Sequence, residues 1–152
     1  MKTWMSLAIG LALWTGCGKE HEHGQRHHSH EAPNGGTMVE LNHHKCHLEF
    51  FRDENNATRL LAVAHTFHPD HQLVKLSMTE FTLIATVDGE KKALLFKPVV
   101  DALAGNSAES SSRYEASAGW LERVDTFEAN LVRLDYPGGS AANKAIQFGK
   151  KD

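Results

Sequence analysis

The chain has 152 residues, of which 41% are hydrophobic and 23% charged, and its formal net charge at pH 7 is −3. This length fits one domain with its own hydrophobic core, and the absence of a Lys/Arg-rich stripe or basic tail excludes a typical nucleic-acid-binding protein, so no nucleic-acid partner is expected. The unusual feature of the composition is eleven histidines, which fall into three clusters along the chain.

Residues 1–16 are typical of a bacterial export signal. Lys2 precedes an apolar run at residues 4–14, which is too short to span a bilayer as a stable helix. The small residues before Cys17 resemble the lipobox of bacterial lipoproteins, and an ordinary signal with a chance cysteine is the alternative. The resemblance implies cleavage before Cys17 and acylation of Cys17, which anchors the chain in the lipid bilayer. Gly18, where Asp would imply inner-membrane retention, implies the periplasmic face of the outer membrane.

Residues 17–36 are expected to form a flexible tether. They hold one Ala and no larger aliphatic or aromatic side chain, so they cannot bury enough apolar surface to offset the cost of ordering the chain. The tether ends in a turn signal at residues 33–36. Neutral imidazole is a good ligand for Zn, Cu and Ni, and the alternative is a solvated linker that binds metal incidentally. The candidate ligands in the tether are His21, His23, His27, His28 and His30.

Beyond the tether, residues 37–150 are predicted to form a small antiparallel β-sandwich of about seven or eight strands. The pattern there consists of short apolar or alternating runs separated by turn signals, with no helical period sustained over several turns. Asp88-Gly89 is a strong signal for a two-residue hairpin. Strands are expected at residues 37–41, 46–50, 58–67, 73–78, 81–87, 92–96, 114–120, 127–136 and 145–148.

Cys46 and His47 are predicted to point to opposite faces of their strand, because neighbouring strand residues alternate. Cys46 shares the apolar face with Leu48 and Phe50, so we expect a buried thiol that behaves as a small hydrophobe. A role for Cys46 as a metal ligand is the alternative. With Cys17 acylated, Cys46 has no disulfide partner within the chain.

The second and third histidine clusters are also candidates for metal binding. His47 could bind an ion together with a histidine from the preceding turn, and Glu49 could supply an oxygen. A strong zinc site takes about three or four ligands, so the third cluster or the tether would have to contribute. His65 is expected to be a core histidine, because it shares an apolar strand face. The candidates in these clusters are His43, His44, His47, Glu49, His68 and His71.

Two short motifs carry a family resemblance. The sequence Ala-Pro-Asn-Gly-Gly-Thr-Met-Val-Glu-Leu at residues 32–41, followed by His-Leu-Glu-Phe at 47–50, resembles a segment near the start of some periplasmic adaptor subunits of heavy-metal efflux pumps. That segment reads Pro-His-Gly-Gly, a β-strand, then His-Leu-Glu. The resemblance implies an extracytoplasmic β-domain linked to metal handling, with a metal-efflux or other envelope protein as partner. Asn34 replaces the histidine of the pattern, and the coiled-coil hairpin of a complete adaptor is not recognisable.

The sequence therefore predicts an anchored periplasmic lipoprotein that binds Zn, Cu or Ni as a buffer, carrier or sensor. The alternative is a non-catalytic interaction module for an envelope protein, in which the histidines are incidental. We do not expect an enzyme, because no catalytic-triad spacing, Gly-rich phosphate loop or pair of carboxylates is recognisable. No cofactor beyond such a metal ion is required.

Overall fold

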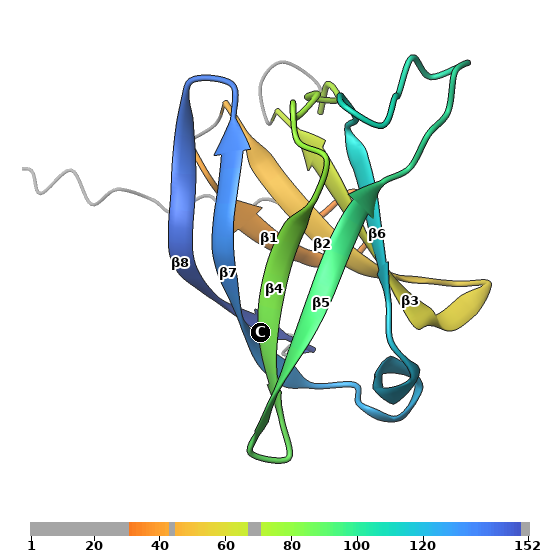
Figure 1. The fold of residues 1–152 in the computed structure, drawn as a ribbon, viewed down its shortest axis with the longest axis vertical. Helices are drawn as coiled ribbons and strands as arrows, with labels where there is room; N and C mark the ends of the chain where they lie inside the picture. Colours follow the sequence, from red (N-terminus) through yellow and green to blue (C-terminus); the bar gives the residue numbers. More distant parts are fainter. Residues whose placement is uncertain (1–30, 43–44, 67–70, 150–152) are drawn as a thin grey trace, which may run out of the picture.

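Eight antiparallel strands form one sheet, in the order β1-β2-β3-β6-β5-β4-β7-β8 (Figure 1). The computed structural model describes residues 31–42, 45–66 and 71–149. The predicted export signal, Cys17, the five histidines of the predicted tether, His43, His44 and His68 lie outside these ranges. The elements are β1 (Thr37–Glu40), β2 (His47–Asp53), β3 (Asn56–His65), β4 (Phe81–Val87), β5 (Glu90–Pro98), β6 (Arg113–Ser117), the 3-10 helix η1 (Gly119–Arg123), β7 (Phe127–Tyr136) and β8 (Gly139–Phe148).

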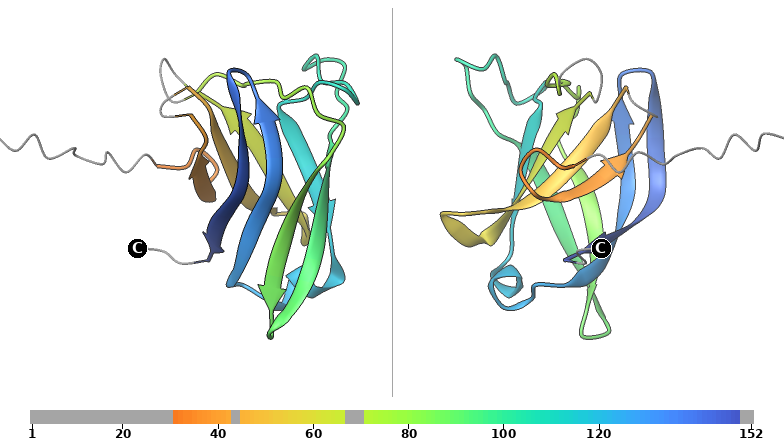
Figure 2. Two further views of the ribbon diagram at one scale, coloured as in Figure 1. Left: turned by 60° about the vertical axis from the view of Figure 1, so that its left-hand side comes forward. Right: turned by 180° about the vertical axis from the view of Figure 1, so that it is seen from behind.

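The all-β, antiparallel prediction is confirmed, but the sheet curls into a nearly closed barrel where two separate sheets were expected (Figure 2). Strand β6 joins the two halves, because it pairs with β3 along its length and with β5 through Lys97 and Pro98. The first and last strands approach one another at the remaining seam, where Lys144 Nζ donates to the Glu40 carbonyl. Periodicity identifies strands but not their partners, so it could not distinguish a sandwich from this barrel.

Turn chemistry was predicted more accurately than strand ends. Asp88 and Gly89 have φ values of 53° and 79°, as the tight β4–β5 hairpin requires, which confirms the predicted turn. The last strand is longer than expected and begins at Gly139. The predicted strand at residues 73–78 is wrong, because that segment makes only isolated bridges at Leu73 and Leu76. No helix in the described part of the chain is both long and apolar enough to cross a bilayer.

The barrel interior is packed with aromatic and aliphatic side chains. Phe50 lies at its centre, with ring centroids 5.5 Å from Phe96 and 5.6 Å from Phe148 in edge-to-face contacts. Strand β2 follows the prediction, since Leu48 and Phe50 belong to the core and Cys46 is buried.

Strand β3 presents the opposite face to the one predicted. Leu60, Ala62 and Ala64 fill the core, whereas the alternate residues, including Val63 and His65, lie on the outer side of the barrel. Both faces of this strand are apolar, so a two-residue period could not identify the inner one.

Candidate functional site

The candidate site lies on the outer side of the barrel, on strands β2 and β3. His47 on β2 is directly opposite His65 on β3, and Glu49 follows His47 on the same face. Although this face points away from the core, His47 and His65 are each 2% exposed and Glu49 is 0% exposed. They are buried because the chain before β1 lies across the outside of β2 (Figure 2), and because residues 71–73 pack against His65.

Glu49 holds that preceding segment through three hydrogen bonds. The backbone N–H groups of Asn34 and Gly36 donate to Oε1 at 2.8 and 3.1 Å, and the Asn34 side-chain Nδ2 donates to Oε2 at 2.8 Å. The N–H groups of Asn34 and Gly36 converge on one oxygen, and N–H groups that converge at a turn form a concave binding site for an anion, here a buried carboxylate. Glu49 therefore fixes the point at which the N-terminal segment enters the domain.

The turn at residues 32–36 is shaped for this contact. Gly35 has a φ of 67°, and its N–H donates to the Ala32 carbonyl at 2.9 Å. Gly36 lies flat on β2, since a Cβ atom there would be 2.2 Å from the Phe50 carbonyl oxygen. The tether was predicted to extend through residue 36, but its last residues are part of the folded domain, because Glu49 offers the partners that the turn needs.

The tautomer of His65 follows from its hydrogen bond. His65 Nδ1 is 3.2 Å from the Thr66 carbonyl oxygen, and a carbonyl only accepts, so Nδ1 carries the proton. In the neutral ring, Nε2 is then the nitrogen with the lone pair, and it lies 3.8 Å from Glu49 Oε2.

Two further imidazoles flank His65. The ring centroid of His47 is 6.3 Å away in a stacked arrangement, and that of His71 is 5.5 Å away in an edge-to-face arrangement. His71 is exposed and adopts a φ of 42°, a left-handed conformation that residues with a side chain adopt infrequently. His71 thus connects the buried His65 to the surface.

A hollow of about 380 Å³ opens beside these histidines, on the outer side of β2, β3 and β6. Its lining includes the apolar side chains of Leu61, Val63 and Leu73, of which Leu73 is 53% exposed. Its charged lining residues are Asp53, Arg59, Arg113 and Glu115. His65 and His71 also line the hollow, as do Pro33 and Asn34 from the N-terminal turn. The hollow, the histidines and the entry point of the N-terminal segment are therefore contiguous.

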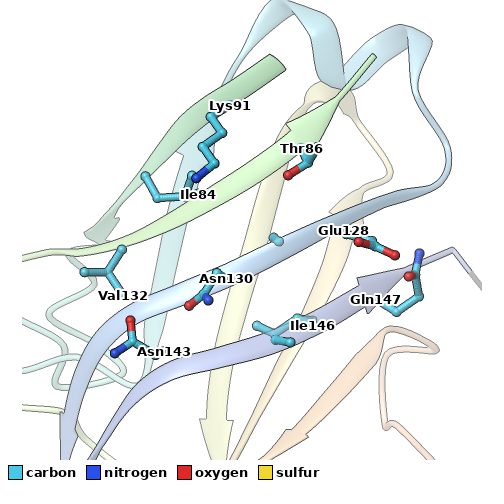
Figure 3. Close-up of a pocket in the computed structure, with 11 residues that line it drawn as sticks. Ile84, Thr86, Lys91, Glu128, Asn130, Val132, Asn143, Ile146 and Gln147 are labelled. Atoms are coloured by element: carbon cyan, nitrogen blue, oxygen red, sulfur yellow. The ribbon is translucent and has the colours of Figure 1, made fainter. Parts of the chain in front are cut away.

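A second hollow, of about 640 Å³, lies on the outer side of β4, β7 and β8 (Figure 3). Its side chains are mainly amide, aliphatic and hydroxyl groups, and Figure 3 shows them spread along the strands with no common centre. Lys91 and Glu128 are its charged residues. This surface does not gather titratable groups, so we place the candidate site at the histidines.

Comparison of the chain with protein-family models, with curated proteins and with solved structures gave no match. The interpretation of the site therefore depends on its own chemistry.

The structure brings three of the predicted ligands together: His47, Glu49 and His71 surround His65. Within residues 31–42, 45–66 and 71–149, however, no three His, Cys, Asp or Glu side chains are arranged to hold one ion together. Cys46 is buried, and burial raises the pKa of its thiol from 9.0 to about 11, which disfavours the thiolate that binds metals.

Sequence reasoning missed two residues of the site. His65 was assigned to the core, because its strand neighbours are apolar, and Asn34 was noted only as a departure from a histidine in the resembling pattern. The repeated apolar residues on both faces of β3 were a signal that its outer face is also covered. No local pattern indicates that Asn34 contacts Glu49, fifteen residues further along the chain.

Proposed function

We propose that the protein is a membrane-anchored envelope lipoprotein that binds a divalent transition-metal ion, Zn, Cu or Ni. His65 and His71 are the ligands that the folded domain contributes, and Glu49 lies beside them. Acylated Cys17 holds the chain at the periplasmic face of the outer membrane, where a metal-efflux or other envelope protein is the expected partner. The observation that carries the proposal is the 5.5 Å spacing of the two imidazole rings next to a buried carboxylate.

The spacing supports the proposal quantitatively. Two imidazoles that bind one ion through bonds of about 2.0–2.1 Å have ring centroids about 5–6 Å apart at tetrahedral angles. His65 and His71 fall within this range, and His47 lies just beyond it. The Nδ1–H of His65 donates to a backbone carbonyl, which is the contact that commonly orients a metal-binding imidazole.

The backbone of His71 supports the same role. A left-handed φ costs a residue with a side chain about 1–2 kcal/mol, and such conformations are concentrated at functional sites. Here the unusual conformation belongs to the residue that packs its ring against His65.

The test is a calorimetric titration of the chain from residue 17 onward, with Cys17→Ser, against Zn²⁺, Cu²⁺ and Ni²⁺. We expect sub-micromolar binding of at least one ion, weakened at least about tenfold by His65→Ala and by His71→Ala. Gln72→Ala, at the exposed neighbour of His71, is the matched control and should bind like the parent.

Thermal denaturation of each variant establishes that it is folded before its affinity is compared. Binding that is micromolar or weaker in the parent chain, or that is unchanged in both histidine variants, would contradict the proposal. The interaction module for an envelope protein would then be the better account.

A further inference from the structure

We propose that Asn34 is a modification site: the backbone nitrogen of Gly35 attacks its side-chain amide, and the resulting deamidation releases the N-terminal turn at residues 32–36 from Glu49. The sequence contains one Asn-Gly pair, and it is formed by these two residues. The inference goes beyond the proposed function, because it requires no metal ion.

The reaction consumes only water. The Gly35 nitrogen loses its proton and forms a bond to the Asn34 side-chain carbonyl carbon, Cγ, and the Nδ2 group leaves with that proton as ammonia. Water then opens the cyclic imide at either carbonyl, which leaves aspartate or isoaspartate at residue 34. Glycine favours the attack, because it has no Cβ to crowd its nitrogen and its backbone adopts many conformations. Asn34 is exposed, so water reaches the imide.

The folded turn holds both reacting groups in other contacts. The Gly35 N–H donates to the Ala32 carbonyl at 2.9 Å, so its nitrogen keeps its proton. The leaving group, Nδ2 of Asn34, donates to Glu49 Oε2 at 2.8 Å. The attached turn therefore protects Asn34, and the reaction proceeds when the turn detaches from β2. Such local opening does not require the barrel to unfold.

Neither product fits the place that Asn34 occupies. In aspartate, a carboxylate oxygen replaces the Nδ2 group that lay 2.8 Å from Glu49 Oε2. Glu49 is 0% exposed, and two like charges this close in a buried site repel each other strongly. In isoaspartate the backbone gains a methylene group. Gly36 has little room to shift in response, because a Cβ atom there would be 2.2 Å from the Phe50 carbonyl oxygen.

Release of the turn changes the hollow on the outer side of β2, β3 and β6. Pro33 and Asn34 line this hollow together with His65 and His71, so detachment removes part of its wall and exposes Glu49 to water. Because ammonia is lost, the change is permanent. The modified chain is therefore a second, lasting form of the folded protein.

The first experiment follows deamidation of the chain from residue 17, with Cys17→Ser, by mass spectrometry of its tryptic peptides at mildly alkaline pH. We expect modification of Asn34 in the folded chain, at a rate at least about tenfold lower than in the same chain unfolded in urea. Equal rates in the folded and unfolded chains, or no modification in the folded chain, would overturn the proposal.

Two variants distinguish detachment of the turn from unfolding of the whole barrel. Glu49→Gln weakens the hydrogen bonds of the turn and should accelerate deamidation about five- to thirtyfold. Tyr114→Phe is the matched control, because it removes a buried hydroxyl that bonds the carbonyls of Leu76 and Met78 and leaves the turn intact. It should change the rate less than about twofold. Equal acceleration by the two variants would overturn the proposal, since opening would then be global.

The second experiment measures release of the turn. Asn34→Asp reproduces the aspartate product, and Asn34→Ala loses the same side-chain hydrogen bond without adding a charge. Amide hydrogen exchange at Gly36 reports detachment, because this N–H donates to Glu49 Oε1 at 3.1 Å. Exchange should be at least about tenfold faster in Asn34→Asp than in Asn34→Ala. Equal exchange in the two variants would show that the new charge does not release the turn, and would also overturn the proposal.

Discussion

Replacing Glu49 tests the contact that fixes the N-terminal segment. Glu49→Ala leaves three N–H donors around a site that is 0% exposed, two from the backbone and one from the Asn34 side chain. Hydrogen bonds to a charged group contribute about 1.5–3 kcal/mol each, but the turn can detach and be hydrated, which limits the loss. We expect Glu49→Ala to lower the free energy of unfolding by about 3–4 kcal/mol.

Glu49→Gln should lower the free energy of unfolding less than Glu49→Ala does. The amide of Gln retains one acceptor oxygen, and Asn34 can rotate its own amide to accept from the new NH₂ group. The remaining hydrogen bonds would no longer be made to a charged group, which should lower the free energy of unfolding by about 1–2 kcal/mol. The order of stability should be the parent, then Glu49→Gln, then Glu49→Ala.

Urea denaturation of the chain from residue 17 measures these differences, with Trp120 as the reporter, since Trp4 and Trp14 are not in that chain. In thermal denaturation, a domain of about 120 residues should lose about 4 °C in Tm per kcal/mol. Glu90→Gln, at an exposed carboxylate, should change stability by less than about 0.5 kcal/mol. A loss below about 1 kcal/mol for Glu49→Ala would refute the reasoning.

Two other buried groups give further predictions. Tyr114→Phe should lower the free energy of unfolding by about 1–2 kcal/mol in urea denaturation, because the buried hydroxyl shares its proton between the carbonyls of Leu76 and Met78; an unchanged midpoint would contradict this. Cys46 should resist thiol reagents at pH 8 until the protein unfolds, and rapid labelling of the folded chain would argue against its burial. Burial raises the pKa of the Cys46 thiol from 9.0 to about 11 in the folded state, so the protein keeps its full free energy of unfolding below pH 9. That free energy should fall by up to about 2–3 kcal/mol as the pH rises to 11. Cys46→Ala should remove that part of the pH dependence.

Features that depend on neighbouring residues could be predicted from the sequence. The hairpin at Asp88-Gly89 needs two adjacent residues that tolerate positive φ, and the alternation around Cys46 directly places Leu48 and Phe50 on the inner face. Both depend on local backbone geometry, which a sequence pattern records.

Features that depend on distant contacts could not be predicted. The outer face of β3 is buried by segments on either side of it in sequence, so His65 lies in a polar cluster although its strand neighbours are apolar. Residues 73–78 have a strand-like pattern but continue along the rim, with Tyr114 bonded to their carbonyls. A tertiary contact that no local pattern records determines the surroundings of His65 and the conformation of residues 73–78.

The lone pairs of Glu49 determine whether the N-terminal turn and a metal ion can be held at the same time. An ionised carboxylate has about four acceptor positions, and the turn occupies three of them. The remaining position is on Oε2, the oxygen that faces His65 Nε2 at 3.8 Å. A cation between these atoms therefore need not displace the turn.

Zn²⁺ should consequently stabilise the folded chain, by about 2.7 kcal/mol at a hundredfold excess over its Kd. The two kinds of variant should then behave differently. Glu49→Ala should weaken both the fold and Zn²⁺ binding, because it releases the turn at Asn34 and Gly36 and removes the carboxylate beside His65. His71→Ala, at an exposed side chain, should weaken Zn²⁺ binding while leaving the metal-free midpoint in urea nearly unchanged. If Zn²⁺ left the stability of the parent chain unchanged or lowered it, the ion would bind the unfolded chain at least as well as the folded one, and the shared use of Glu49 would be wrong.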